Sequence, residues 1–327
     1  MDPASFFRRT ASLIVAGKGG VGKTTVAAVL ARAASMAGLD VLMLELEGSS
    51  GATRMLGLEG DLSYSDTEVL AGAKGEGSIR ARILTPDETL IEYLEDHGLG
   101  KLSRKLASTG ALDVVATAVP GIKDILLLAK VKQLEKADPA ELLVLDAPAA
   151  GHALSFLTTS VGLADAARSG PIKAQAIDVL EFLADPRRCQ VMLVTLAEET
   201  PVNETLQTAA MLKERTQVTL APVVANAVYP DLDGLGPAMD GPLTGEEALD
   251  RSLIDAASFR LQRSALQAAQ LSRLQAQLPI QQIRLPYLFG PIRGRSSVDE
   301  LARAFAKEVG ALSDKDLDGS GAREEGQ

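Results

Sequence analysis

The stretch 12–25, SLIVAGKGGVGKTT, constrains the fold more than any other part of the sequence. It begins with a short apolar run, residues 12–16, which predicts a buried parallel strand. Residues 17–24, GKGGVGKT, then fit the pattern G-x-x-x-x-G-K-S/T of a phosphate-binding loop. An Ala-rich amphipathic run over 26–37 predicts a helix that ends at Gly38. The order of strand, loop and helix therefore predicts an α/β fold that binds a phosphate group.

The residue types in this loop suit a polyphosphate and a divalent cation. Glycines allow backbone N–H groups to turn towards phosphate oxygens without a clash of Cβ atoms. Lys23 supplies a positive charge for the β- and γ-phosphates, and Thr24 offers a hydroxyl ligand to Mg²⁺. We therefore predict a nucleotide site formed by Gly17, Gly19, Gly20, Val21, Gly22, Lys23, Thr24 and Thr25.

Polar side chains also follow three other apolar runs. The run 41–46 is followed by Glu47, and the run 141–145 by Asp146, which is the Walker B pattern. The short run 223–225 is followed by Asn226, whose amide is suited to bidentate recognition of adenine. Because the carboxyl ends of parallel strands face the ligand crevice, we expect these side chains near the loop. Asp146 is then expected at Mg²⁺ and Glu47 at the γ-phosphate.

The rest of the chain alternates strand and helix signals, which predicts a doubly wound, mostly parallel sheet flanked by helices. We expect one domain over 1–312, with helical insertions at about 87–135 and 153–185, and a disordered acidic tail over 313–327. The tail matches a calcium-loop pattern from Asp314 to Glu325, but no exiting helix follows it, which disfavours Ca²⁺ binding. The other expected strands are 79–84, 191–196 and 281–285. The expected helices are 87–96, 122–134, 153–184 with a break at Gly170, 202–215, 246–277 and 298–312. For the helix 202–215 we expect Thr200 as the N-cap and Pro201 at the first helical position.

Composition narrows the partners and the compartment. The chain has 327 residues, of which 46% are hydrophobic, and a net charge of −10, which argues against a nucleic-acid partner. Cys189 is the single cysteine. One chain of this sequence therefore cannot form a disulfide framework, a CxxC metal site or an iron–sulfur ligand set by itself. We find no apolar run of signal-peptide or membrane-spanning length, and we expect a cytoplasmic protein with at most transient membrane association.

Several motifs together resemble those of one ATPase family. Lys18 follows Gly17 directly, and this second lysine is typical of the deviant phosphate-loop ATPases such as MinD and ParA. Within that group the order of motifs is similar to that of the ArsA/Get3-type ATPases, above all their single-domain actinobacterial members. The similar segments are PGI at 120–122, DAPAAGHAL at 146–154, VVAN at 223–226, LPYL at 285–288 and IRG at 292–294.

This resemblance implies roles for particular residues. ATP and Mg²⁺ are the implied cofactors, with phosphate on Lys23, metal on Thr24, and Asp146 one layer further out, beyond the atoms that touch the metal. Lys18 is implied to reach the nucleotide of a second subunit, in a homodimer or in a heterodimer with a paralogue. By the same resemblance Asn226 is implied to read adenine and Pro286 to be a cofactor-binding residue, and the implied catalytic residues are Lys18, Lys23, Glu47 and Asp146. Where the family has an Asp that orients the attacking water, this sequence has Glu47, which is one methylene longer.

The leading hypothesis is a dimeric ATPase that couples its nucleotide state to a protein client. In the family such clients bind a hydrophobic groove, which the apolar stretches 99–134 and 153–184 would supply here. A weakly hydrolysing subunit of a paralogous heterodimer is the alternative that Glu47 suggests. A small-molecule kinase stays open, but the sequence offers no convincing general base. An arsenite pump is disfavoured by the single cysteine, and a MinD-like membrane regulator by the acidic tail.

Overall fold

The computed structural model describes residues 1–47, 51–96, 98, 100, 121–137, 140–148, 151–166, 169–232, 246–290 and 294–312. These residues form one nine-stranded sheet in the order β3-β4-β2-β5-β1-β6-β8-β9, with β7 paired to β6. Only β3 is antiparallel to its neighbour, as the sequence predicted for a mostly parallel sheet. The strands are β1 Ser12–Gly17, β2 Val41–Leu46, β3 Thr67–Leu70, β4 Ile79–Leu84, β5 Leu142–Asp146, β6 Cys189–Leu196, β7 Thr219–Leu220, β8 Val223–Val228 and β9 Gln282–Pro286.

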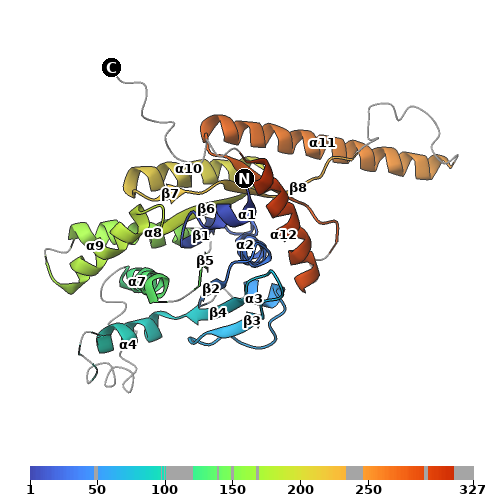
Figure 1. Ribbon diagram of the computed structural model, residues 1–327. Coiled ribbons are helices and arrows are strands. Elements are labelled where there is room, and N and C mark those ends of the chain that lie inside the picture. Colours follow the sequence, from blue (N-terminus) through green and yellow to red (C-terminus); the bar gives the residue numbers. More distant parts are fainter. Residues whose placement is uncertain are drawn as a thin grey trace.

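Helices cover both faces of the sheet (Figure 1). They are α1 Pro3–Phe7, α2 Lys23–Met36, α3 Ala52–Met55, α4 Pro86–Asp96, α7 Ile122–Ala137, α8 Gly151–Ala166, α9 Pro171–Ala184, α10 Glu199–Arg215, α11 Glu247–Gln277 and α12 Gly294–Ala311. Alternate residues of β1 belong to different cores: Leu13 and Val15 pack with α2 and α12, whereas Ile14 packs with α7 to α10. Strands buried on both faces therefore read as continuous apolar runs in the sequence.

Most expected elements are present with small shifts at their ends. Thr85 caps α4, because its Oγ1 accepts a hydrogen bond of 3.2 Å from the backbone N–H of Glu88. The expected start of α10 was wrong: the helix begins at Glu199 with Glu198 as N-cap, so Thr200 and Pro201 lie inside its first turn. Proline is tolerated there because N–H groups of a first turn have no acceptor within the helix. The antiparallel edge strand β3 was not predicted.

The apolar helices expected to supply a client groove mostly pack into the core. The large apolar side chains of α7 are buried except for the half-buried Ile122, and so are most of those described in α8 and α9, although Ile177 is exposed. Residues 101–120, which belong to the same expected surface, lie outside the described residues, as does the tail 313–327. Among the described helices none is both long and apolar enough to span a membrane.

Candidate nucleotide-binding site

The expected site lies where the strand order reverses around β1. Strand β1 pairs with β5 on one side and with β6 on the other, and the chain leaves it through the loop that starts α2. At such a switch point the connections diverge and leave a crevice at the carboxyl ends of the strands. Asp146 ends β5 and Glu47 follows β2, so the predicted residues of three strands meet at one edge of the sheet.

Two glycines of the loop are required by close approaches. A Cβ atom on Gly17 would lie 2.4 Å from the backbone oxygen of Val194, and Gly17 has φ +150°. A Cβ atom on Gly22, at φ +87°, would lie 2.3 Å from Nδ2 of Asn226. Gly22 is also the N-cap of α2, so its conformation directs the first N–H groups of that helix into the site.

The two lysines of the loop have different surroundings. Lys23 is 7% exposed, and its Nζ donates a 3.1 Å hydrogen bond to the backbone oxygen of Lys18. Burial lowers the pKa of Lys23, and the nearby charge of Asp146 acts in the opposite direction. The Lys18 side chain is 44% exposed and forms an ion pair of 3.2 Å with Glu204 of α10. Lys18 is therefore held by an acid of its own chain, at a position that solvent reaches.

Asp146 is the central acid of the site. Its Oδ2 accepts a 2.8 Å hydrogen bond from Thr24 Oγ1, while its Oδ1 is buried without a hydrogen-bond partner among the described residues. Burial raises the pKa of Asp146 to about 6, and Glu45 contributes in the same direction against Thr24 and Lys23. A hydroxyl next to an unpartnered carboxylate oxygen is the oxygen-only set that suits Mg²⁺, directly or through a bound water. The residues present therefore fit the expected metal.

The two acids near the end of β2 differ in burial. Glu47, the expected catalytic residue, has an exposed side chain, and its backbone N–H donates 3.1 Å to the oxygen of Leu84. Glu45 is 1% exposed and is the register partner of Asp146 on the adjacent strand. Sequence reasoning missed Glu45, although an acid within the apolar run VLMLEL is itself a signal that the buried strand carries a function.

Asn226 contacts the phosphate loop directly. Its Nδ2 donates a 2.9 Å hydrogen bond to the backbone oxygen of Val21. The ladder between β8 and β9 shifts register between Ala225 and Val228, and Ala227 adopts φ +55°, which is rare for a residue with a side chain. This bulge directs Asn226 towards the loop. Its expected contact with adenine stays a prediction.

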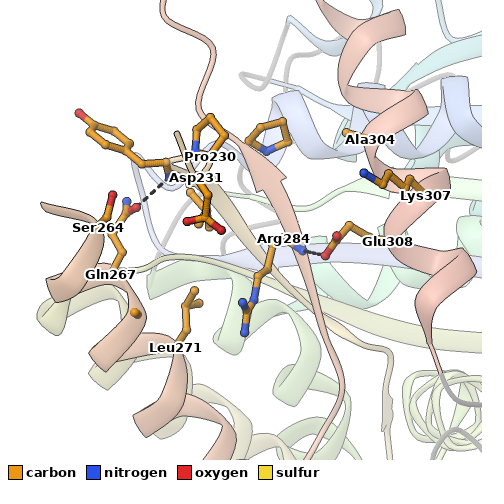
Figure 2. A pocket seen from close by; sticks show the side chains of 13 residues that line it. Pro230, Asp231, Ser264, Gln267, Leu271, Arg284, Ala304, Lys307 and Glu308 are labelled. Atoms are coloured by element: carbon orange, nitrogen blue, oxygen red, sulfur yellow. Dashed lines mark hydrogen bonds between the residues drawn. The ribbon is translucent and has the colours of Figure 1, made fainter. Parts of the chain in front are cut away.

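Pro286 ends β9 and lines a cavity of about 470 Å³ between β9, α11 and α12 (Figure 2). Gln267 of α11 accepts a 2.8 Å hydrogen bond from the backbone N–H of Tyr229 there, and Glu308 accepts one of 3.0 Å from that of Arg284. None of the residues that line this cavity belongs to the phosphate loop. Pro286 is the register partner of Val228, two residues after Asn226 on β8, and the cavity that it lines is separate from the Thr24–Asp146 pair.

Comparison with known proteins agrees with the motifs. The family model of the CobQ/CobB/MinD/ParA nucleotide binding domain matches residues 12–241. ATPase BagA of Mycobacterium tuberculosis is 31% identical over 224 residues, which cover 66% of this chain and 65% of that protein. The arsenical pump-driving ATPase of Escherichia coli is 28% identical over 62% of this chain and 32% of its own length. ATPase get3 of Schizosaccharomyces japonicus is 26% identical over 44% of this chain and 42% of its own. The match thus spans about two thirds of BagA and less than half of the other two.

Proposed function

The chain belongs to the CobQ/CobB/MinD/ParA nucleotide-binding family and is related to ArsA and Get3, and on this premise we propose that it hydrolyses ATP with Mg²⁺ to ADP and phosphate. The observation that carries this proposal is the Thr24–Asp146 hydrogen bond, beside which one buried carboxylate oxygen has no partner among the described residues. A loop of glycines and a buried lysine lie on the other side of Thr24. Such an arrangement is suited to a triphosphate with its metal.

Each residue then has a distinct task. The N–H groups at the start of α2 and the ammonium of Lys23 bind the phosphates, while Thr24 and Asp146 hold Mg²⁺. The bound Mg²⁺ would supply positive charge against the developing charge of the γ-phosphoryl group. Glu47 orients the attacking water from the end of β2. Asn226 fixes the loop and lies on the side where the base is expected.

We further propose that two subunits assemble when ATP is bound and that Lys18 serves the nucleotide of the other subunit. The support is its position: Lys18 lies on the exposed part of the loop, and its side chain is 44% exposed although Glu204 engages it. A change in assembly would then report the nucleotide state to a protein partner. The described apolar helices pack mainly into the core, which disfavours a groove formed by these helices alone.

A weakly hydrolysing subunit of a heterodimer is the second candidate, and the exposed side chain of Glu47 favours it. Arsenite binding through several thiolates is disfavoured, because the sequence has one cysteine. That residue, Cys189, is fully buried, and burial raises the pKa of its thiol.

Phosphate release by the purified chain tests the proposal. Wild-type protein should release phosphate from ATP in the presence of Mg²⁺ and lose this activity on addition of EDTA. Lys23→Ala should lose both phosphate release and binding of a fluorescent ATP analogue, while its far-UV circular dichroism stays unchanged. If the wild-type chain binds ATP without releasing phosphate, and Glu47→Asp gains phosphate release, the result would support the weakly hydrolysing subunit instead. An absence of Mg²⁺-dependent ATP binding would exclude both candidates.

A further inference from the structure

We propose that Glu45 is a positioning residue, which holds the segment after β2 in place against the phosphate loop. The expected effect of Glu45 on turnover rests on the proposed ATPase function, whereas its expected effect on the order of the segment after β2 does not. Glu45 lies outside the phosphate loop and outside the Walker B strand, and it is not the acid that motif comparison selects. Its burial, its three donors and its place beside Asp146 carry the inference.

The carboxylate of Glu45 has donors on both oxygens. Oε1 accepts hydrogen bonds of 2.8 Å from the backbone N–H of Thr53 and of 2.8 Å from its hydroxyl. Oε2 accepts a longer hydrogen bond of 3.3 Å from the backbone N–H of Gly51. Glu45 is 1% exposed and Thr53 is 2% exposed, so water does not replace these donors. A buried charge held in this way strongly favours the conformation that supplies its donors.

These contacts close a short loop of the chain. Strand β2 ends at Leu46, one residue after Glu45, and the chain returns to the side chain of Glu45 at Gly51 and Thr53. Glu47, the proposed water-orienting residue, lies inside the segment that is closed in this way. Both ends of its segment are therefore fixed by one residue, through the backbone of β2 at one end and through the carboxylate at the other.

The same anchor places the segment against Thr24. A Cβ atom on Gly51 would lie 3.5 Å from Thr24 Cγ2, which is ordinary van der Waals contact. Thr24 in turn donates to Asp146, the register partner of Glu45. The two adjacent acids thus have different roles. Asp146 keeps an oxygen without a partner and is available to a metal, whereas the oxygens of Glu45 are engaged by Gly51 and Thr53 and position the chain.

Amide hydrogen exchange of the nucleotide-free chain tests the anchor without any need for activity. Glu45→Gln keeps the shape and removes the charge, and Thr53→Val removes the hydroxyl but keeps the backbone donor. Both variants should speed exchange in a peptide that covers residues 51–56 by about tenfold or more, with little change in peptides from β5. The conservative Thr53→Ser should stay close to wild type. Glu68→Gln, at an exposed position of β3, is the matched control for loss of a glutamate charge.

Turnover tests the catalytic consequence in the same variants. Glu45→Gln and Thr53→Val should lower kcat for ATP by roughly tenfold while KM changes much less, because the phosphate loop itself is untouched. The kcat of the double variant should be no lower than that of Glu45→Gln alone, since the two substitutions remove the same anchor.

The two tests separate the possible failures. Unchanged exchange over 51–56 in Glu45→Gln overturns the inference, whatever the activity. Faster exchange with normal kcat also overturns it, because the segment would then move without effect on the reaction. If wild-type protein has no ATPase activity but exchange rises as expected, the proposed function fails while the anchor stands.

Discussion

Thr24 Oγ1 lies 2.8 Å from Asp146 Oδ2, so one hydroxyl group joins the phosphate loop to the end of β5. The two residues are distant in sequence and meet because β1 and β5 are adjacent parallel strands, in register from Ser12 and Leu143 to Val15 and Asp146. A hydroxyl that bonds one carboxylate oxygen leaves the other available. The pair is thus the point at which the loop, the sheet and a metal ion would meet.

Thr24→Val should remove the metal dependence of nucleotide binding. Valine has nearly the same shape but neither donates to Asp146 nor binds a cation. We expect ATP affinity with Mg²⁺ to fall at least about tenfold, towards the affinity measured in EDTA. Isothermal titration with and without Mg²⁺ measures the difference. Thr24→Ser keeps the hydroxyl and should retain most of the Mg²⁺ effect; equal losses in both variants would contradict the assignment of the hydroxyl.

Asp146→Asn should stabilise the nucleotide-free chain at neutral pH. The raised pKa of Asp146 means that the folded state holds a proton more tightly than the unfolded chain, so stability falls as pH rises from about 4 to 6. A shift from 3.8 to about 6 corresponds to about 3 kcal/mol at 1.36 kcal/mol per unit. Because the new amide N–H₂ is itself buried and lowers this gain, we expect a net gain of roughly 1–2 kcal/mol.

Urea unfolding of wild type and Asp146→Asn at several pH values checks this prediction. The advantage of the variant should be complete above about pH 6.5, should shrink as the pH falls towards 4, and should vanish below about pH 3, where the wild-type side chain is neutral in both states. The same variant should lose Mg²⁺-dependent ATP binding. An advantage that did not change with pH would show that the charge of Asp146 is not its source.

Local motifs account for the part of the site that the sequence could predict. The loop 17–24 and the Asp146 strand are short patterns whose residue types carry their own chemistry, and the structure brings them together. Glu45 was missed because its role depends on contacts that no local sequence pattern reveals. Its donors, Gly51 and Thr53, have no distinctive pattern, and its neighbour Asp146 is brought beside it only by the order of the strands.

Tertiary packing also explains the other differences. The bulge at Ala227 depends on the pairing of β8 with β9, which is invisible in the run 223–225. Strand β3 is an edge strand of partly exposed residues and lacks the apolar run of the inner strands. The start of α10 was misplaced because Thr200–Pro201 matches a common capping pattern, whereas the helix begins at Glu199 after Glu198, whose side chain makes no capping hydrogen bond.

Gly22→Ala should disturb the site through Asn226. The new Cβ would lie 2.3 Å from Nδ2 of Asn226, so this side chain must leave the oxygen of Val21. Gly20→Ala is the matched control, because Gly20 has a similar φ of +84° but open space around its Cβ position. Both variants should lose about 1 kcal/mol from backbone strain, and Gly22→Ala should lose more.

The excess cost of Gly22→Ala should disappear when Asn226 is shortened. In an Asn226→Ala background the clash is absent, so Gly22→Ala and Gly20→Ala should destabilise the chain about equally. Thermal unfolding of the six proteins of this cycle measures the effect. A difference that persisted without the Asn226 side chain would mean that its origin lies in the loop backbone and not in this contact.

Mixing of two inactive variants should restore activity if Lys18 acts on the nucleotide of a second subunit. Lys18→Ala keeps its own Lys23, and Lys23→Ala keeps its own Lys18, so a mixed dimer has one site with both lysines. Random pairing of equal amounts would make half of the dimers mixed, each with one such site, but the Lys23→Ala subunit itself binds ATP poorly and assembles less. The mixture should thus recover phosphate release up to about a quarter of the wild-type rate. Glu204→Gln should change the stability by less than about 0.5 kcal/mol, because its pair with Lys18 is partly exposed, and should leave this restoration intact. If the mixture stays as inactive as its two components while ATP-dependent dimers are seen by light scattering, Lys18 acts on the loop of its own chain, and the ion pair with Glu204 is then part of that site.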